Sequence, residues 1–230
     1  MITPIKTYIL HCKTLSDRKD YMQSIVEMFK FDAVWIMDHD ANELTDEIKQ
    51  QYYAANREEA MKRSAALWGS GHERLLGPGE TSIAIKHTIA MQKIANGKED
   101  FAIVLEDDCL FSNDFNQRFD EYLLKTPSDW DIIHVGNGYG MSPERFVSSH
   151  SNVAYKMMHP ASRCAEAILV KKEAAIKIAR TMMPFYLAAD WELAFQYWIH
   201  RLNVYWWEPA LVTQGSHSGA FKSSLQLERK

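Results

Sequence analysis

The segment FAIVLEDDCLF, residues 101–111, decides the fold because a short apolar run ends there in three consecutive carboxylates. A continuous apolar run of this length is typical of a buried strand. Glu106, Asp107 and Asp108 cannot all lie unpaired in a core, because burial of an unpaired charge is costly. We therefore expect the strand to reach the surface at its carboxyl end, where ligands bind in open α/β sheets.

These three carboxylates suit a hard divalent cation such as Mg²⁺ or Mn²⁺, which prefers oxygen ligands. A plainer interpretation is also open, because a strand can end in acidic residues when the loop that follows is solvated. The remainder of the chain bears on the choice between the two.

The composition is that of a globular protein with a sizeable core. The chain has 230 residues, 47% hydrophobic and 24% charged, which suits one large α/β domain. The net charge of −4 gives no indication of a nucleic-acid or membrane-surface binder. Three cysteines without metal-site spacing favour a reducing compartment. Since neither a membrane-span pattern nor a signal-peptide pattern is present, we expect a cytoplasmic protein without a membrane span.

Strand and helix patterns alternate along the chain, which predicts an α/β fold and a single domain over residues 1–230. Patterns at 6–11, 16–29 and 31–37 form a strand–helix–strand unit, for which a parallel sheet is expected. Ser16 is the expected N-cap of the first helix. Further strands are expected at 101–105, 130–135, 153–158, 165–170 and 203–207. Helices are expected within 44–66 and at 80–96, 113–125, 171–181 and 190–202. Loops are expected at 67–80 and 136–150, and the polar segment 215–230 has the composition of a mobile tail.

Other polar residues accompany the acidic strand end. Asp190 and Glu192 stand in AADWEL, where Asp190 could also serve as a helix N-cap. His217 follows the last strand, either as an exposed tail residue or as a metal ligand if the tail folds back over the sheet. His87 lies on the apolar face of the helix 80–96, a position more typical of a core histidine than of a ligand.

Together these segments resemble glycosyltransferase family 25, which includes bacterial lipooligosaccharide galactosyltransferases and collagen β-galactosyltransferases. The segments that carry the resemblance, in the family's order, are KTYILHCKTLSDRKDYM (6–22), LGPGETSIAIKHT (76–88), FAIVLEDDCLF (101–111), DWDIIHVG (129–136), CAEAILVKKEAAIKI (164–178) and AADWEL (188–193). The chain departs from the family pattern at three places. His11 or Cys12 stands where the family usually has Asn, and Lys86 stands where it has Ser. Ser162 and Arg163 stand where a Gly-Thr pair is more usual. These departures bear on the donor sugar and the acceptor more than on the reaction class.

The resemblance implies a GT-A-like (Rossmann-like) domain with a mainly parallel central sheet flanked by helices. It implies metal-dependent transfer of a sugar, with galactose favoured, from a UDP-linked donor to a glycan or protein hydroxyl, with inversion. The cation would be Mn²⁺ or Mg²⁺, acting as a Lewis acid on the leaving diphosphate. The implied metal ligands are Asp108 first, then Asp107 and His217. The residues implied to lie near the donor are Arg18, Glu80, His87, Glu106 and Asp107.

The resemblance also implies a general base, for which Asp190 is the first candidate and Glu192 the second. A helix N-terminus beside Asp190 would favour its ionised form and so lower its basicity somewhat. Two other functions remain open: a divalent-metal phosphohydrolase or nucleotidyltransferase, and a sugar-binding domain without catalysis. A domain without catalysis has no reason to keep three adjacent carboxylates and a downstream histidine. The donor sugar, the acceptor and the oligomeric state are left open by the sequence.

Overall fold

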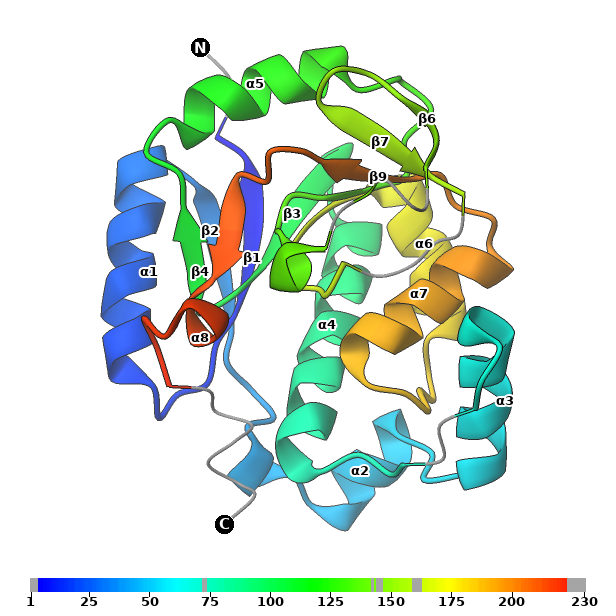
Figure 1. The fold of residues 1–230 in the computed structure, drawn as a ribbon. Coiled ribbons are helices and arrows are strands. Elements are labelled where there is room, and N and C mark those ends of the chain that lie inside the picture. Colours follow the sequence, from blue (N-terminus) through cyan, green and yellow to red (C-terminus); the bar gives the residue numbers. More distant parts are fainter. Residues whose placement is uncertain (1–3, 72–73, 142, 144–146, 159–162, 223–230) are drawn as a thin grey trace.

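The computed structural model describes residues 4–71, 74–141, 143, 147–158 and 163–222. Within these ranges, helices and strands alternate and build an α/β fold (Figure 1). The helices are α1 (Ser16–Phe29), α2 (Asp46–Tyr52), α3 (Arg57–Trp68), α4 (Pro78–Asn96), α5 (Phe115–Lys125), α6 (Lys172–Thr181), α7 (Ala189–Ile199) and α8 (Gly215–Ser218), with 3₁₀ turns η1 (Ala41–Glu43) and η2 (Gly138–Gly140). The strands are β1 (Lys6–Leu10), β2 (Asp32–Ile36), β3 (Phe101–Glu106), β4 (Cys109–Phe111), β5 (Ile132–His134), β6 (Val147–His150), β7 (Ala154–Met157), β8 (Ala167–Lys171), β9 (Val204–Trp207) and β10 (Val212–Gln214).

The central sheet of the described chain has eight strands in the order β2-β1-β3-β8-β5-β9-β7-β6. β1 pairs in parallel with β2 and β3, and β5 pairs in parallel with β9. β8 and β7 run against their neighbours. The expected helix-flanked α/β sheet is confirmed, and it is mixed because these two strands are reversed. β4 and β10, which were not expected, form a separate antiparallel pair beside it.

Helices cover both faces of the sheet (Figure 1). Alternate residues of a strand point to opposite faces, so Ile103 and Leu105 of β3 pack with α1 and α5. Val104, between them, packs with α4, α6 and α7. Burial on both faces explains why β3 reads as an unbroken apolar run. The strand therefore stays in the core until it ends at Glu106.

Three local expectations differ from the structure. α1 begins at Ser16, but its N-cap is Leu15, and no side chain caps the helix. The segment 136–150, expected as a loop, contains η2 and β6. The polar segment 215–230 begins with the short helix α8, anchored where Gly215 N–H donates to the backbone oxygen of Asp108 (2.7 Å); residues 223–230 lie outside the described part. None of the described helices combines the length and the apolar character needed to cross a membrane.

Candidate active site

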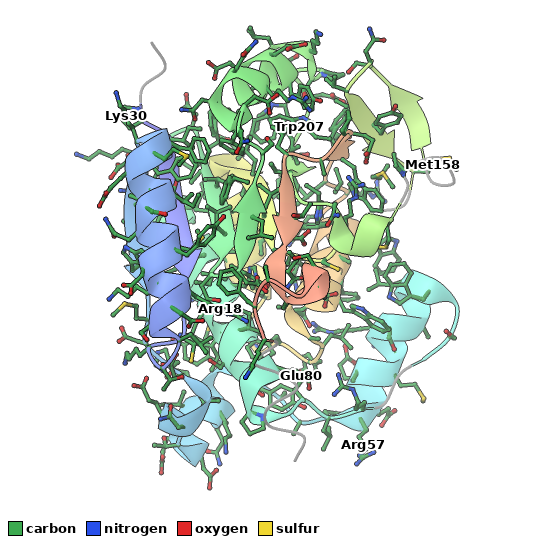
Figure 2. The ribbon with its side chains drawn as sticks, turned by 60° about the vertical axis from the view of Figure 1, so that its left-hand side comes forward. Arg18, Lys30, Arg57, Glu80, Met158 and Trp207 are labelled. Atoms are coloured by element: carbon green, nitrogen blue, oxygen red, sulfur yellow. The ribbon has the colours of Figure 1, made fainter. Side chains whose placement is uncertain are left out.

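A cavity of about 530 Å³ lies where β1 and β3 end and β8 begins. The starts of α4 and α7 and the β10–α8 segment complete its wall. Figure 2 shows Arg18 on α1 and Glu80 at the start of α4 on the same side of the molecule, near α8. The cavity brings together seven of the residues that the sequence singled out: Arg18, Glu80, Glu106, Asp107, Asp108, Asp190 and His217. His87 and Glu192 are outside its lining.

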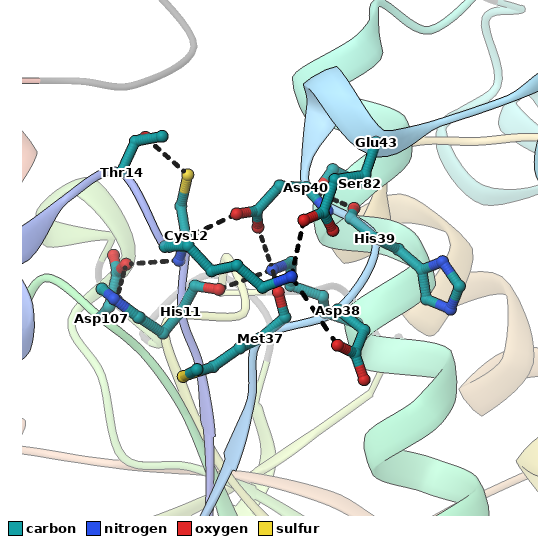
Figure 3. A network of polar contacts seen from close by, with 12 residues as sticks. His11, Cys12, Thr14, Met37, Asp38, His39, Asp40, Glu43, Ser82 and Asp107 are labelled. Atoms are coloured by element: carbon teal, nitrogen blue, oxygen red, sulfur yellow. Dashed lines mark hydrogen bonds and ion pairs between the residues drawn. The ribbon is translucent and has the colours of Figure 1, made fainter.

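Asp107 fastens the end of β3 to β1 and α1. Its Oδ1 accepts a hydrogen bond from Arg18 Nη1 (2.6 Å), and its Oδ2 lies 2.8 Å from His11 Nδ1 and 3.1 Å from Cys12 N (Figure 3). Burial alone would raise the pKa of Asp107, but the His11 hydrogen bond and the Arg18 charge outweigh it and hold the pKa below its usual value. The expectation that the carboxylates reach the surface is thus wrong for Asp108, which is 2% exposed, and for Asp107, which is 5% exposed. Charged and hydrogen-bonding partners make its burial tolerable.

Arg18 continues this connection to the C-terminal segment. Its Nη2 donates to the backbone oxygen of Lys222 (2.6 Å), and the guanidinium carbon lies 5.6 Å from the centre of the Phe221 ring. The phosphate expected at Arg18 would have to bind beside these protein contacts. Arg18 therefore holds the last described residues against the carboxyl end of β3.

Asp108 has one carboxyl oxygen without a partner. Ser216 N–H donates to Oδ2 (3.2 Å), whereas Oδ1 is buried and receives no hydrogen bond within the described structure. His217 follows on α8; burial lowers its pKa, and the Asp108 charge acts in the opposite direction. The segment after β10 thus folds back over the strand end, while His217 itself is exposed, so features of both interpretations of His217 are present.

The cavity does not contain a complete metal shell made of protein alone. In the part of the chain that the structure describes, no three His, Cys, Asp or Glu side chains are grouped so that they could hold a metal ion. Asp108, with its orphaned Oδ1, and His217 on the neighbouring α8 are the protein groups that could contribute to a cation site. Mg²⁺ is commonly bound by one or two carboxylates together with substrate phosphates, so such an incomplete set fits a cation delivered with a diphosphate.

Glu106 and His87 form a pair behind the acidic strand end. His87 Nε2 lies 3.3 Å from Glu106 Oε1, and Gln214 Nε2 donates to Oε2 (3.4 Å). Burial and the charge of Asp108 raise the pKa of Glu106 well above its usual value. Burial lowers the pKa of His87 to about 4. His87 is therefore a neutral core histidine that positions Glu106 from outside the cavity.

Asp190 faces the cavity from the first turn of α7. The N-cap of this helix is Ala188, so the alternative of Asp190 as N-cap is wrong. Trp191 N–H donates to its Oδ1 (2.9 Å). Burial raises the pKa of Asp190 more than this hydrogen bond lowers it, the reverse of the shift expected from the helix N-terminus. A carboxylate with a raised pKa is the stronger base.

Glu192 lies on the other side of α7, away from the cavity. Its side chain is 0% exposed, and Arg63 Nη1 donates to Oε1 (2.7 Å). Gln196 Nε2 donates to the same oxygen (3.0 Å), and the N–H groups of Tyr186 and Leu187 donate to Oε2 (3.0 and 3.3 Å). These contacts join α7 to α3 and to the segment before α7, so the geometry gives Glu192 a structural place.

Glu80 is at the mouth of the cavity and stabilises the start of α4. Its Oε2 accepts hydrogen bonds from Gly77 N–H (2.9 Å) and from Arg74 Nη1 (2.8 Å). Arg74 also pairs with Oε1 through Nη2 and lines the cavity itself. An arginine held in this way adds positive charge to a cavity that Arg18 also lines.

The sequence analysis did not identify a buried lysine–aspartate pair at the cavity, whose lining includes Lys86. Lys86 Nζ donates to Asp40 Oδ1 (2.5 Å) and to the backbone oxygen of His11 (2.6 Å), and Asp40 Oδ2 accepts from Lys13 N–H (2.8 Å). Figure 3 shows Asp40 beside His11 and Cys12 in this network. A lysine in the apolar part of a helix pattern and an aspartate after a strand were the available signals.

Glu166 was also missed as a site residue. It lies just before β8, lines the cavity and is only 1% exposed. Gly138 N–H donates to its Oε1 (2.8 Å), and burial raises its pKa to about 7. Its place within the apolar run CAEAILV gave no sign of a functional carboxyl.

The chain is similar to known proteins in sequence and, more weakly, in fold. The family model described as glycosyltransferase family 25 (LPS biosynthesis protein) matches residues 4–183. No curated protein matches the chain in sequence. Among solved structures, galactosyltransferase LgtC in complex with donor and acceptor sugar analogues is similar at 9% identity and TM-score 0.43, over 98% of this chain and 99% of that one. Mouse xyloside xylosyltransferase 1, in its apo form, is similar at 10% identity and TM-score 0.39, over 88% and 84%. Scores this low carry no argument about substrate or mechanism.

Proposed function

The chain belongs to glycosyltransferase family 25, and on this premise we propose a metal-dependent transfer of a sugar from a UDP-linked donor. In this proposal galactose is the favoured sugar, and it moves with inversion to a hydroxyl group of a glycan or a glycoprotein. The observation that carries the proposal is the orphaned Oδ1 of Asp108, at the end of β3 in the cavity. A buried carboxylate oxygen without a donor is what a cation-binding site provides.

The donor diphosphate would bind at the end of β3, with Asp108 and His217 holding a cation between protein and phosphate. A divalent cation there supplies Lewis-acid neutralisation of the leaving diphosphate. Both oxygens of Asp107 accept hydrogen bonds from the protein, so Asp107 acts mainly by fixing the strand end. Arg74 and Arg18 supply the positive charge of the site, because a guanidinium matches phosphate geometry.

Asp190 would accept the proton of the acceptor hydroxyl. Inversion requires a base on the side of the sugar opposite the leaving group, as in the inverting glycosidases. Asp190 lies on α7, whereas the proposed diphosphate site lies at the end of β3 and on α8, and both line the same cavity. The raised pKa of Asp190 brings its proton affinity closer to neutral pH, which suits a general base.

A donor screen by nucleotide release tests this proposal. The protein is incubated with Mn²⁺ and each common UDP- and GDP-sugar, with and without EDTA. Asp108→Asn keeps the shape of the side chain, and Asp20→Asn on the exposed face of α1 is the matched control. We expect release of UDP from one sugar nucleotide, lost with EDTA and in Asp108→Asn but not in Asp20→Asn.

Other outcomes point to the alternatives. Release of a sugar phosphate or of inorganic phosphate without sugar transfer would indicate a phosphohydrolase. Binding of sugars without any turnover would indicate a sugar-binding domain. Either result would refute the proposed function.

A further inference from the structure

Glu166 is a buried carboxyl in the cavity to which the steps above give no role. β3 and β8 are antiparallel, with Leu105 paired to Ala167, and Glu106 N–H donates to the backbone oxygen of Glu166 (2.8 Å). Residues opposite each other in such a pair point to the same face. Glu166 therefore stands one strand over from Glu106, about 5 Å away along the sheet, and both line the cavity.

The surrounding backbone is shaped to receive this carboxyl group. Gly138 N–H holds Oε1 at 2.8 Å. A Cβ atom at Gly136 would lie 2.3 Å from the same oxygen, so any side chain at this position would displace the carboxyl group. The other backbone group that interacts with the carboxyl is the N–H of Glu166 itself. One oxygen is thus anchored, and the carboxyl group is presented to a ligand in the cavity.

The chemistry of this position favours a neutral polar ligand over a phosphate or a cation. The buried carboxyl group holds its proton up to near-neutral pH, so it can donate a hydrogen bond as well as accept one. The nearby Arg163 does not provide a phosphate site, because it is buried and is not part of the cavity lining. A hydroxyl group, which also both donates and accepts, is the matching partner.

We propose that Glu166 is a specificity-determining residue that binds one hydroxyl group of the transferred sugar. The assignment rests on the proposed function, because it places the diphosphate at the end of β3. The sugar bonded to that diphosphate would then lie over the neighbouring start of β8. Glu166 would lie below the sugar, between the leaving group and Asp190.

Deoxy-sugar donors test the assignment. The wild-type protein, Glu166→Gln and Glu166→Ala are assayed for kcat/KM with the preferred UDP-sugar and with its 2-, 3-, 4- and 6-deoxy analogues. A site built to bind a hydroxyl discriminates strongly against the analogue that lacks it. For the wild type, we expect kcat/KM to fall at least about tenfold with one of the analogues. For Glu166→Ala, kcat/KM with the parent sugar should be about tenfold below that of the wild type, and it should fall little further with that same analogue. Glu166→Gln, which keeps the shape but alters the donor pattern, should lie between the two.

Controls separate binding of the sugar from general damage. The affinity of the Glu166 variants for UDP alone should stay within about twofold of the wild-type value, because UDP lacks the sugar. Glu173→Gln, on the exposed face of α6, should behave as the wild type does. Equal sensitivity of the wild type and Glu166→Ala to every deoxy position would overturn the assignment while leaving the proposed function intact. Absence of donor turnover by the wild type would refute both.

Discussion

Two acidic residues, two positions apart on α7, should respond to substitution in opposite ways. Asp190→Asn should abolish most of the activity and leave the fold stable. Glu192→Ala should destabilise the fold and leave the chemistry of the folded protein largely in place. The reason is that Asp190 lines the cavity, whereas Glu192 is buried against Arg63, Gln196 and two backbone N–H groups.

The size of both effects follows from these contacts. Breaking a buried ion pair by removing one partner costs about 3–5 kcal/mol. Arg63 would keep its 3.2 Å contact with Glu59, which favours the lower end of this range. At roughly 2–4 °C per kcal/mol for a chain of this size, a cost of about 3 kcal/mol in Glu192→Ala should lower Tm by about 6–12 °C. Loss of a general base lowers kcat by about 10²–10⁴-fold, so a loss of this size is expected for Asp190→Asn. The same substitution should change Tm by less than about 3 °C.

Thermal unfolding and nucleotide release, measured on the same preparations below the Tm of the weakest variant, check this pair. Glu58→Ala, an exposed acidic residue in the first turn of α3, is the control and should change neither quantity. Near-normal turnover of Asp190→Asn would remove Asp190 as the base. A Glu192→Ala variant with unchanged Tm and a large loss in kcat would show that the structural place given to Glu192 is wrong.

Three further substitutions test the buried polar groups around the cavity. Gly136→Ala should lower Tm because its Cβ would lie 2.3 Å from Glu166 Oε1, and combining it with Glu166→Ala should recover part of the loss; equal Tm values for Gly136→Ala and wild type would contradict the packing. The pKa of Glu166 is raised from 4.5 to about 7 on folding, so its contribution to stability is present below pH 4.5 and is lost as pH rises through 7. In urea unfolding, the free energy of unfolding of Glu166→Gln should therefore rise relative to that of the wild type by up to roughly 3 kcal/mol between pH 4.5 and 8. A difference between the two proteins that does not change with pH would argue against the raised pKa of Glu166. Lys86→Met leaves the carboxylate of Asp40 buried without its ion-pair partner and should cost about 3–5 kcal/mol in urea unfolding, whereas Lys86→Met with Asp40→Asn should cost less than the single change; equal costs would show that the pair is not coupled.

The central strand and its acidic end could be predicted because their signals are local. Burial on both faces makes β3 an unbroken apolar run, and the change to carboxylates at Glu106 marks its end. The direction of β8 could not be predicted, because an apolar run looks the same in a parallel and in an antiparallel strand. β4 and β10 were missed because their three-residue lengths leave no periodic pattern.

The partners of the site residues could not be predicted because they are far away in the chain. Asp107 was expected as a metal ligand, yet its oxygens are bonded by groups 89 to 96 positions earlier. Glu166 is anchored by Gly138, 28 positions before it. Asp190 and Glu192 look equivalent in AADWEL, and only the packing of α7 on α3 separates their environments. Sequence patterns therefore identified the acidic cluster, and tertiary contacts divide its members by role.

The most direct test of the central claim is a calorimetric titration of UDP into the protein with Mn²⁺, with EDTA, and in Asp108→Asn. The account predicts binding with Mn²⁺ that weakens at least about tenfold when the metal is removed and again when the Asp108 carboxylate is replaced, because that carboxylate is a ligand to the cation. Asp20→Asn should bind UDP as the wild type does. UDP affinity that is the same with Mn²⁺ and EDTA, or the same in Asp108→Asn and wild type, would contradict the placement of the donor diphosphate at the end of β3.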